Sequence, residues 1–400
     1  MRDRSSEIDR LADLLVGFGA NLQPGQILGL TAYFGMEDIA RAIARHAYKR
    51  GARYVDVLWW DQLVKRERLE HADADTLEFV PPWLSQRMQW FSDERAARIG
   101  LAGSDASVFE GIDPARMGRD LLPYISDVPR VVNERTTNWT AGPAPNPGWA
   151  RRVHPELEPE AALEKLWDEV VHVLRLDTGD PVGAWHERMK AIVASADRLT
   201  ERRFDAIHLK GPGTDVTIGL LPSSRWWGAD FETVDGITHY PNLPTEEVFT
   251  TPDPERVDGH VSATMPLEMY GSFMDGIRIE FEGGRAVRAD ADVGAEALRA
   301  AIAKDDGASR LGELALVDRE GRIGPLGTVF HETLLDENAA SHVALGNAYT
   351  FPVDDPADRE RVNVSGIHVD FMIGSNEVDV DGVTHEGDRV PVLRQGSWQI

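Results

Sequence analysis

An imidazole and a carboxylate lie two residues apart in the segment 364–373, which reads VSGIHVDFMI. The segment has the composition of a β-strand, in which alternate side chains point to opposite faces. His368 and Asp370 would therefore share one face. The other face would fill the core with Ile367, Val369, Phe371 and Ile373. A histidine beside a carboxylate on a rigid strand predicts a pair of metal ligands. The alternative is a half-exposed strand whose polar residues simply face outward.

A second chemical signal is the glutamate within the segment 311–317, LGELALV. Both faces of this predicted strand are apolar, so Glu313 is predicted to be buried. An unpaired buried carboxylate is costly, so a metal ion, a proton or an arginine must compensate it. A structural Arg–Glu pair is therefore the alternative to a metal site.

The segment 330–349, FHETLLDENAASHVALGNAY, offers further ligand types. Glu337 and His342 are five residues apart and do not share a face of an ideal helix. Gly346 interrupts the segment before Tyr349. We therefore expect a loop or a broken helix, and such segments often carry functional residues.

Two adjacent acids lie in a proline-flanked segment, 241–252, which reads PNLPTEEVFTTP. In an extended chain Glu246 and Glu247 point to opposite sides. We expect one of them to face a site and the other to face solvent.

The elements that must position these residues fall into two regions. The first region begins with an apolar run at 26–30, a helical pattern at 36–49 and a strand pattern at 54–60. This β-α-β order predicts a layered α/β domain with a mainly parallel sheet. Neither region contains a GxGxxG or GxxxxGK[ST] motif after a strand, so no dinucleotide or nucleoside-triphosphate site is indicated.

The chain changes character in its middle. The Pro/Gly-rich segment 140–147 predicts an irregular loop. Helices are expected at 163–174 and about 184–203, and strands and turns from about 207 onward. We predict two domains: an α/β domain over 1–240 and an α+β domain over 241–400 that carries the metal site.

The composition of the chain excludes several classes of function. The 400 residues include no cysteine, which excludes disulfides, thiolate metal sites and cysteine nucleophiles. A net charge of −25 would repel phosphate backbones, so no nucleic-acid partner is expected. No apolar run is long enough to span a membrane, and the N-terminus lacks a signal-like core. Neither HExxH nor Gly-x-Ser-x-Gly is present. We expect a cytoplasmic enzyme.

Several stretches together closely resemble the metal-dependent aminopeptidases of the aminopeptidase T and aminopeptidase S type. The resemblance keeps its order along most of the chain and is looser over the first 130 residues. The matching stretches are 138–153, 163–189, 204–220, 241–261, 311–318 (LGELALVD), 333–349 (TLLDENAASHVALGNAY) and 365–375 (SGIHVDFMIGS).

The resemblance implies a two-metal centre in the C-terminal domain. The residues that match the family's ligand set are Glu247, Glu313, Glu337, His342, Tyr349, His368 and Asp370. Four carboxylates would balance two divalent ions, and oxygen and imidazole ligands without sulfur suit Zn, Co or Mn better than Mg. Glu313 is the candidate proton shuttle as well as a ligand, and Tyr349 is the second residue assigned to catalysis.

The implied function is the release of N-terminal residues from short peptides by a metal-activated water, favouring apolar first residues. Tryptophans 226 and 227 are candidates to shape that residue's pocket. The resemblance also implies a homodimer. The first alternative is a mononuclear non-haem Fe(II) ring-cleaving dioxygenase using His342, His368 and Asp370. Such a site has no use for three further glutamates. The second alternative is a non-catalytic peptide-binding protein on the same scaffold.

Overall fold

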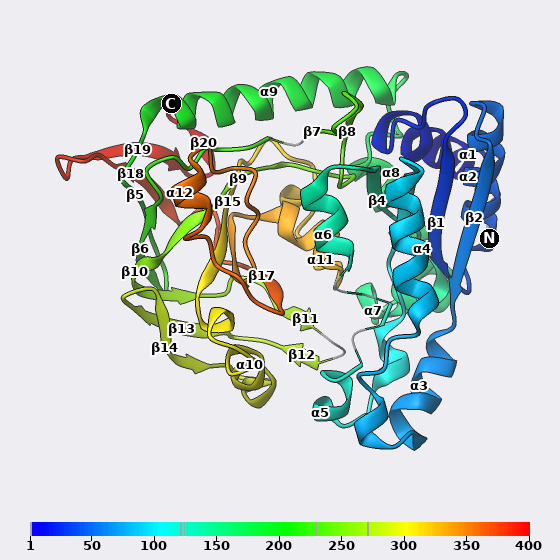
Figure 1. Ribbon diagram of the computed structural model, residues 1–400, viewed down its shortest axis with the longest axis horizontal. Coiled ribbons are helices and arrows are strands. Elements are labelled where there is room, and N and C mark those ends of the chain that lie inside the picture. Colours follow the sequence, from blue (N-terminus) through cyan, green and yellow to red (C-terminus); the bar gives the residue numbers. More distant parts are fainter. Residues whose placement is uncertain (1, 121, 124, 126, 229, 270–271) are drawn as a thin grey trace. The chain divides into compact units, whose positions relative to one another are not determined.

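The computed structural model describes residues 2–120, 122–123, 125, 127–228, 230–269 and 272–400. The chain forms two compact units, Met1–Glu187 with Asp230–Pro244, and Arg188–Ala229 with Thr245–Ile400. Figure 1 labels most of the helices and strands of both units, and each unit is described by itself. A boundary near residue 240 between independently folding domains stays a prediction.

A four-stranded parallel sheet forms the centre of the first unit, in the order β2-β1-β3-β4. Its strands are β1 (Ile27–Tyr33), β2 (Tyr54–Trp60), β3 (Ala97–Ala102) and β4 (Asn138–Pro143). The parallel α/β sheet predicted from the β-α-β pattern is thus confirmed.

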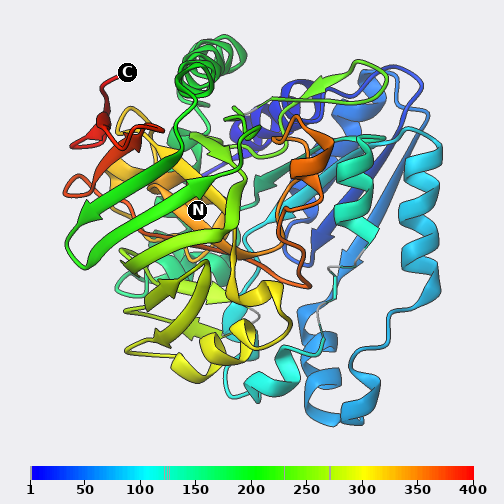
Figure 2. The same ribbon diagram turned by 60° about the vertical axis from the view of Figure 1, so that its left-hand side comes forward.

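Helices surround this sheet, as Figures 1 and 2 show. They include α1 (Ser5–Leu14), α2 (Glu37–Lys49), α3 (Gln62–His71), α4 (Pro82–Asp93), α6 (Asp127–Glu134), α7 (Pro147–Val153) and α8 (Pro159–Val173). The expected helix at 36–49 corresponds to α2, which Gly51 follows in a left-handed conformation (φ 88°). The expected helix at 163–174 corresponds to α8, which begins four residues earlier and ends at Val173, one residue earlier than expected.

The prediction of a loop over 140–147 is wrong for residues 140–143, which form the end of a strand. Residues up to Pro143 belong to β4, and Pro147 opens α7. Proline is tolerated here because β4 is the last strand in the order of its sheet and Pro143 is its final residue. Asn146 fills the short gap and caps α7 by accepting the backbone N–H of Trp149 at 3.1 Å.

The second unit contains two larger antiparallel sheets. One has eight strands in the order β14-β13-β10-β6-β5-β18-β19-β20. These strands are β5 (Ala206–Gly211), β6 (Thr214–Leu220), β10 (Pro252–Ser262), β13 (Arg278–Glu282), β14 (Arg285–Asp290), β18 (Asp379–Val383), β19 (Arg389–Arg394) and β20 (Ser397–Trp398). The other has four strands in the order β17-β16-β15-β9. Its strands are β9 (Glu247–Thr250), β15 (Leu311–Val317), β16 (His342–Gly346) and β17 (His368–Met372).

Helices are fewer in the second unit. They include part of α9 (Pro181–Arg202), α10 (Ala295–Ile302), α11 (Thr333–Asp336) and α12 (Pro356–Arg359). This mixture of strands and helices agrees with the predicted α+β content. Among the described residues, no helix is both long enough and apolar enough to cross a membrane.

Candidate metal centre

The four-stranded antiparallel sheet places five of the predicted ligands on one face. Glu313 on β15 is in register with Ala344 on β16, which is in register with Asp370 on β17. Residues two apart on a strand share a face, so His342 on β16 and His368 on β17 join them. At the far side of β15, Val317 is in register with Glu247 on β9, which puts Glu247 on the same face.

The strand β15 has the bounds expected from the sequence, and all seven of its residues are buried. The four apolar residues predicted to fill the core beside His368 and Asp370 are also buried: Ile367, Val369, Phe371 and Ile373. The core packing of both faces therefore fixes which way the ligands point.

The five side chains form two three-residue groups that share Glu313. In the first, the His342 Nε2 atom lies 3.0 Å from Glu247 Oε2 and 3.8 Å from Glu313 Oε1. In the second, His368 Nε2 lies 3.6 Å from Glu313 Oε2 and 3.4 Å from Asp370 Oδ1. Within each group, one ligand atom per residue lies within 4.8 Å of the others. The two oxygens of Glu313 thus face different groups.

Each histidine is oriented by a backbone carbonyl. The Nδ1 atom of His342 lies 3.2 Å from the Ala340 oxygen, and that of His368 lies 2.8 Å from the Asn347 oxygen. A ring whose Nδ1–H donates to a carbonyl presents its Nε2 lone pair to a metal, the usual outer-sphere support of a histidine ligand. Both Nε2 atoms face the carboxylates.

Burial and crowding of like charges shape the electrostatics of this cluster. Burial raises the pKa of Glu313, the hydrogen bond with His342 opposes that shift, and Asp370 and Glu247 add to it. Burial alone would lower the pKa of His368, but Asp370 and Glu313 raise it to about 10. Without a metal, protonated imidazoles therefore supply the positive charge, and metal binding at such a site releases protons.

An unsatisfied atom supports the fit to a cation. The Oε2 atom of Glu247 is buried and has no hydrogen-bond partner of acceptable geometry, although His342 is close. A buried acceptor without a donor is costly, whereas a bound divalent ion would satisfy it. The donor set, carboxylate oxygens and imidazole nitrogens, is the one expected for Zn, Co or Mn.

Glu337 lies near the cluster but belongs to neither three-residue group, and Tyr349 lies beside His368. Glu337 follows α11, and burial raises its pKa well above the usual range, with Glu247 and Asp370 adding to the shift. The amide of Asn338 donates to Glu337 Oε1 at 3.4 Å. The ring of Tyr349 lies 5.9 Å from the ring of His368, measured between centroids.

The broken helix expected at 330–349 is only partly correct. A short helix and a turn do carry Glu337, but His342 begins the strand β16 rather than lying in a loop. The run His342–Gly346 is buried throughout, because β16 lies between β15 and β17. A five-residue apolar run is too short for its periodicity to show this from sequence.

The prediction that one of the paired glutamates faces solvent is wrong. Glu246 is 2% exposed and accepts from Arg188 Nε at 2.5 Å. The same guanidinium contacts both oxygens of Asp318, at 2.9 and 3.1 Å, and the indole of Trp398 donates to Asp318 at 2.7 Å. Glu246 also donates its backbone N–H to Asn338 at 2.6 Å. This buried network supports the strand ends beside Glu247.

Replacing Arg188 by methionine is expected to lower the free energy of unfolding by about 3–5 kcal/mol, because Glu246 and Asp318 would be left buried without their cation. Chemical denaturation measures the change. Arg198→Met on the same helix is the control, since Arg198 is exposed, and it should change stability by less than about 0.5 kcal/mol. A loss below about 1 kcal/mol for Arg188→Met would contradict the prediction.

Sequence reasoning missed Asn338 and Arg188 as supports of the site. Asn338 is 1% exposed and joins the Glu337 turn to the Glu246 backbone. Its only signal in the sequence is that it directly follows a ligand candidate. Arg188 lies far from the cluster along the chain, and no local pattern connects the two.

Of the two tryptophans predicted near the first-residue pocket, Trp226 is a core residue, 4% exposed. Trp227 is half-buried, and its ring packs edge-on against Phe351 at 5.3 Å. Phe351 in turn contacts the rings of Tyr349 and Phe249 at 5.1 and 6.1 Å. An aromatic cluster therefore adjoins the tyrosine beside His368.

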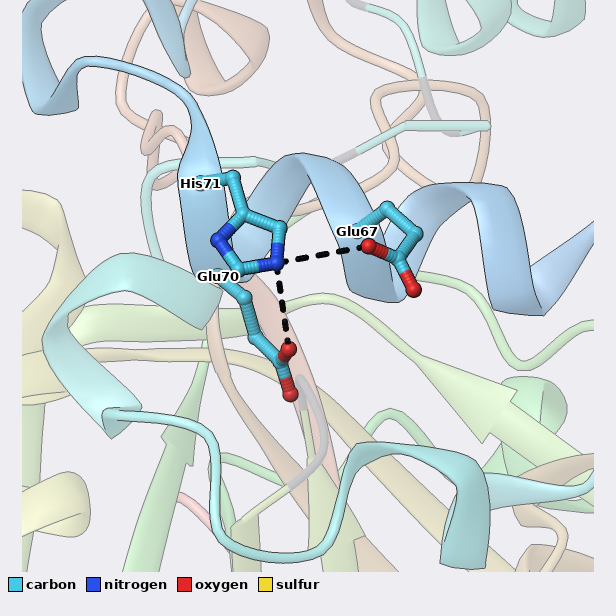
Figure 3. Close-up of side chains that lie close together, drawn as sticks. All are labelled: Glu67, Glu70 and His71. Atoms are coloured by element: carbon cyan, nitrogen blue, oxygen red, sulfur yellow. Dashed lines mark ion pairs between the residues drawn. The ribbon is translucent and has the colours of Figure 1, made fainter.

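A different cluster of ligand types lies on α3 in the first unit. Figure 3 shows His71 between Glu67 and Glu70, with its Nε2 atom 3.4 and 3.7 Å from their carboxylates. All three side chains are exposed. Exposed helical pairs of this kind are common and weak, so we assign no metal to them.

Comparison with known proteins places this geometry in a family. The family model "Thermophilic metalloprotease (M29)" matches residues 4–398. Aminopeptidase T of Thermus aquaticus is 41% identical over 99% of both chains, and aminopeptidase PepS of Streptococcus thermophilus is 36% identical over 98% of both. The solved structure of wild-type AmpT from Thermus thermophilus covers the whole of both chains with a TM-score of 0.92 and 40% identity. These matches confirm the predicted resemblance and the predicted enzyme class, a metallo-aminopeptidase. The chain belongs to the thermophilic metalloprotease (M29) family and is a hydrolase of peptide bonds.

Proposed function

We propose that this enzyme removes N-terminal residues from short peptides with two divalent ions, which the two three-residue groups that share Glu313 would hold. The observation that carries the proposal is that Glu313 belongs to both three-residue groups. Glu247 and His342 would complete one ion's protein ligands, and His368 and Asp370 the other's. A carboxylate that presents one oxygen to each group is the arrangement expected of a bridge.

When bound, a pair of divalent ions lowers the pKa of a water and polarises the carbonyl that the water attacks. Residues of this chain would transfer the proton and donate hydrogen bonds to the substrate. Glu337 lies outside both groups, so we assign the proton transfer to it: its carboxylate accepts the proton of the attacking water and returns it to the leaving amine. This revises the expectation that Glu313 is the shuttle, because its two oxygens face different ligand groups and both would be engaged if each group held an ion.

Tyr349 completes the proposed catalytic set. Its ring centroid lies 5.9 Å from that of His368, and a tyrosine hydroxyl can donate to the oxygen of the attacked carbonyl. We propose this role in place of direct metal ligation. The aromatic cluster of Trp227, Phe249 and Phe351 next to Tyr349 supports a preference for apolar first residues.

Metal analysis combined with peptide digestion tests the proposed function. We expect about two divalent ions per chain, loss of activity on chelation, and cleavage of free tripeptides but little cleavage of their N-acetylated forms. The reason is that a free amino group is the feature an aminopeptidase recognises. Equal rates on free and acetylated peptides would contradict the proposal, as would a single iron per chain with activity on a dihydroxylated ring.

We also propose that the enzyme acts as a homodimer in the cytoplasm, and sedimentation tests the oligomeric state.

A further inference from the structure

The turn at residues 346–348 carries the carbonyl group that orients His368. The Nδ1 atom of His368 lies 2.8 Å from the Asn347 oxygen, so the Nδ1–H donates to that oxygen. The Nε2 atom of the same ring faces the carboxylates of Glu313 and Asp370. Outer contacts of this kind fix the ring of a histidine ligand, and losing them weakens metal binding. The direction of this ligand therefore depends on what holds the turn.

The side chain of Asn363 holds this turn in place. It is 6% exposed, and its amide donates to the carbonyl oxygens of Gly346 at 2.6 Å and Gly307 at 2.8 Å. The backbone carbonyl of Asn363 accepts the N–H of Ala348 at 2.9 Å. Asn363 therefore bonds the residues on both sides of Asn347 and ties them to a separate segment of the chain.

A missing side chain on β15 leaves room for the same turn. A Cβ placed on Gly312 would lie 2.4 Å from the Gly346 oxygen and 2.6 Å from the Asn347 oxygen, closer than Cβ atoms approach backbone. The pairing of β15 with β16 shifts register at Gly312, immediately before Glu313. The orienting carbonyl is therefore packed against the strand that carries Glu313, and only glycine allows this approach.

The other histidine of the site is oriented from a different place. The Nδ1 atom of His342 lies 3.2 Å from the oxygen of Ala340, which precedes β16, whereas Gly346 is the last residue of that strand. The end residues of a five-residue strand lie about 13 Å apart. The contacts of Asn363 are thus made at the end of β16 that orients His368, and the support of His342 lies at the other end.

We propose that Asn363 is a positioning residue that sets the affinity of one of the two proposed ion sites, the one that His368 and Asp370 complete. The inference rests on the two-ion site of the proposed function. Asn363 fixes the turn at 346–348, the turn fixes the ring of His368, and the ring directs its Nε2 lone pair at the ion. The ion site that the other histidine completes keeps its geometry without Asn363.

Dialysis of the metal-loaded enzyme against zinc buffered by graded amounts of a chelator tests this proposal, with the retained ions counted by mass spectrometry. Asn363→Ala should release one ion at a free zinc concentration about tenfold higher than the wild type does, and should hold the other ion with wild-type affinity. The reason is that alanine leaves the Gly346 and Gly307 carbonyls without their donor, so the turn no longer fixes His368. Equal weakening of both ions, or of neither, would overturn the proposal.

A double-mutant cycle shows whether Asn363 acts through His368. On a His368→Ala background, adding Asn363→Ala should not change the affinity of the remaining ion. On a His342→Ala background, the same addition should still weaken the remaining ion about tenfold. Equal effects on the two backgrounds would make Asn363 a general stabiliser of its unit and would overturn the proposal.

Asn146→Ala is the matched control for lost stability. Asn146 is a buried asparagine of the first unit whose amide donates to the backbone carbonyls of Gly103 at 2.6 Å and Ala144 at 3.2 Å. Its variant should melt at a lower temperature and leave both ion affinities unchanged. If Asn363→Ala does not fold, Asn363→Ser replaces it, because a hydroxyl can still donate to one carbonyl. Failure of both Asn363 variants to fold would assign the residue to folding alone and overturn the proposal.

The wild-type result separates this inference from the proposed function. If the wild type retained two ions and Asn363→Ala held both with unchanged affinity, the inference alone would fail. If the wild type held a single ion, the two-ion function would fail, and the inference would stand only if Asn363→Ala weakened that ion.

Discussion

Replacing Glu313 by glutamine is expected to reduce kcat by about 100- to 10,000-fold and to lower the metal content of the purified enzyme. Glu313 belongs to both ligand groups, so the substitution weakens both at once. Glutamine keeps the shape of the side chain, but its amide offers one neutral oxygen where the carboxylate offers two charged ones. Steady-state kinetics and metal analysis by mass spectrometry measure the two effects.

The same substitution should have the opposite effect on the metal-free protein. Glu313 is buried with Glu247 and Asp370 close by, and this environment disfavours its ionised form. Removing that charge relieves repulsion, so the chelated Glu313→Gln variant should melt no lower than the chelated wild type, whereas added metal should stabilise it less.

Glu320→Gln, an exposed glutamate beyond the end of β15, is the control and should leave kcat and metal content unchanged. If Glu313 were a structural partner of an arginine, its glutamine variant would lose stability and keep its rate per folded molecule. That result, or near-native kcat with full metal content, would contradict the bridging role.

The parts of the site that the sequence predicted are those carried by strands with strong alternation or burial. The pattern around His368 and Asp370 predicted both the shared face and the buried opposite face. The apolar surroundings of Glu313 predicted its burial, and its low exposure in β15 agrees. Period-two alternation and continuous apolar runs are local properties, so they can be seen in one strand at a time.

The strand register of the site and the burial of Glu246 could not be predicted from the sequence, because both depend on contacts between distant segments. The register that aligns Glu313 with Asp370 through Ala344 is set by three strands from separate parts of the chain. The burial of Glu246 depends on Arg188, which lies in the middle of a helix. An acid beside a site candidate has the same local signal whether it meets solvent or an arginine, so the alternation argument could not choose between them.

Replacing Glu337 by glutamine is expected to reduce kcat by about 100- to 10,000-fold while KM changes little and both metal ions stay bound. Glu337 lies outside both ligand groups, so its carboxylate is not required to hold either ion in the proposed site. The amide of Asn338 donates to Glu337 Oε1, and glutamine can keep that contact through its own carbonyl oxygen. What glutamine loses is the ability to accept a proton.

Metal content separates this role from ligation. If Glu337 were a ligand, as the family resemblance implied, its glutamine variant would lose metal together with activity, and excess metal would restore part of the rate. If it accepts the proton of the water, activity falls at full metal occupancy and excess metal restores nothing.

Glu332→Gln provides the matched control, since Glu332 is the half-buried residue that precedes α11 in the same segment, and its variant should keep near-native kcat. A Glu337→Gln variant with near-native kcat would remove Glu337 from the mechanism. The proton transfer would then have to be carried by a carboxylate of the ligand groups, and Glu247 is the candidate, because its Oε2 atom makes no hydrogen bond of acceptable geometry.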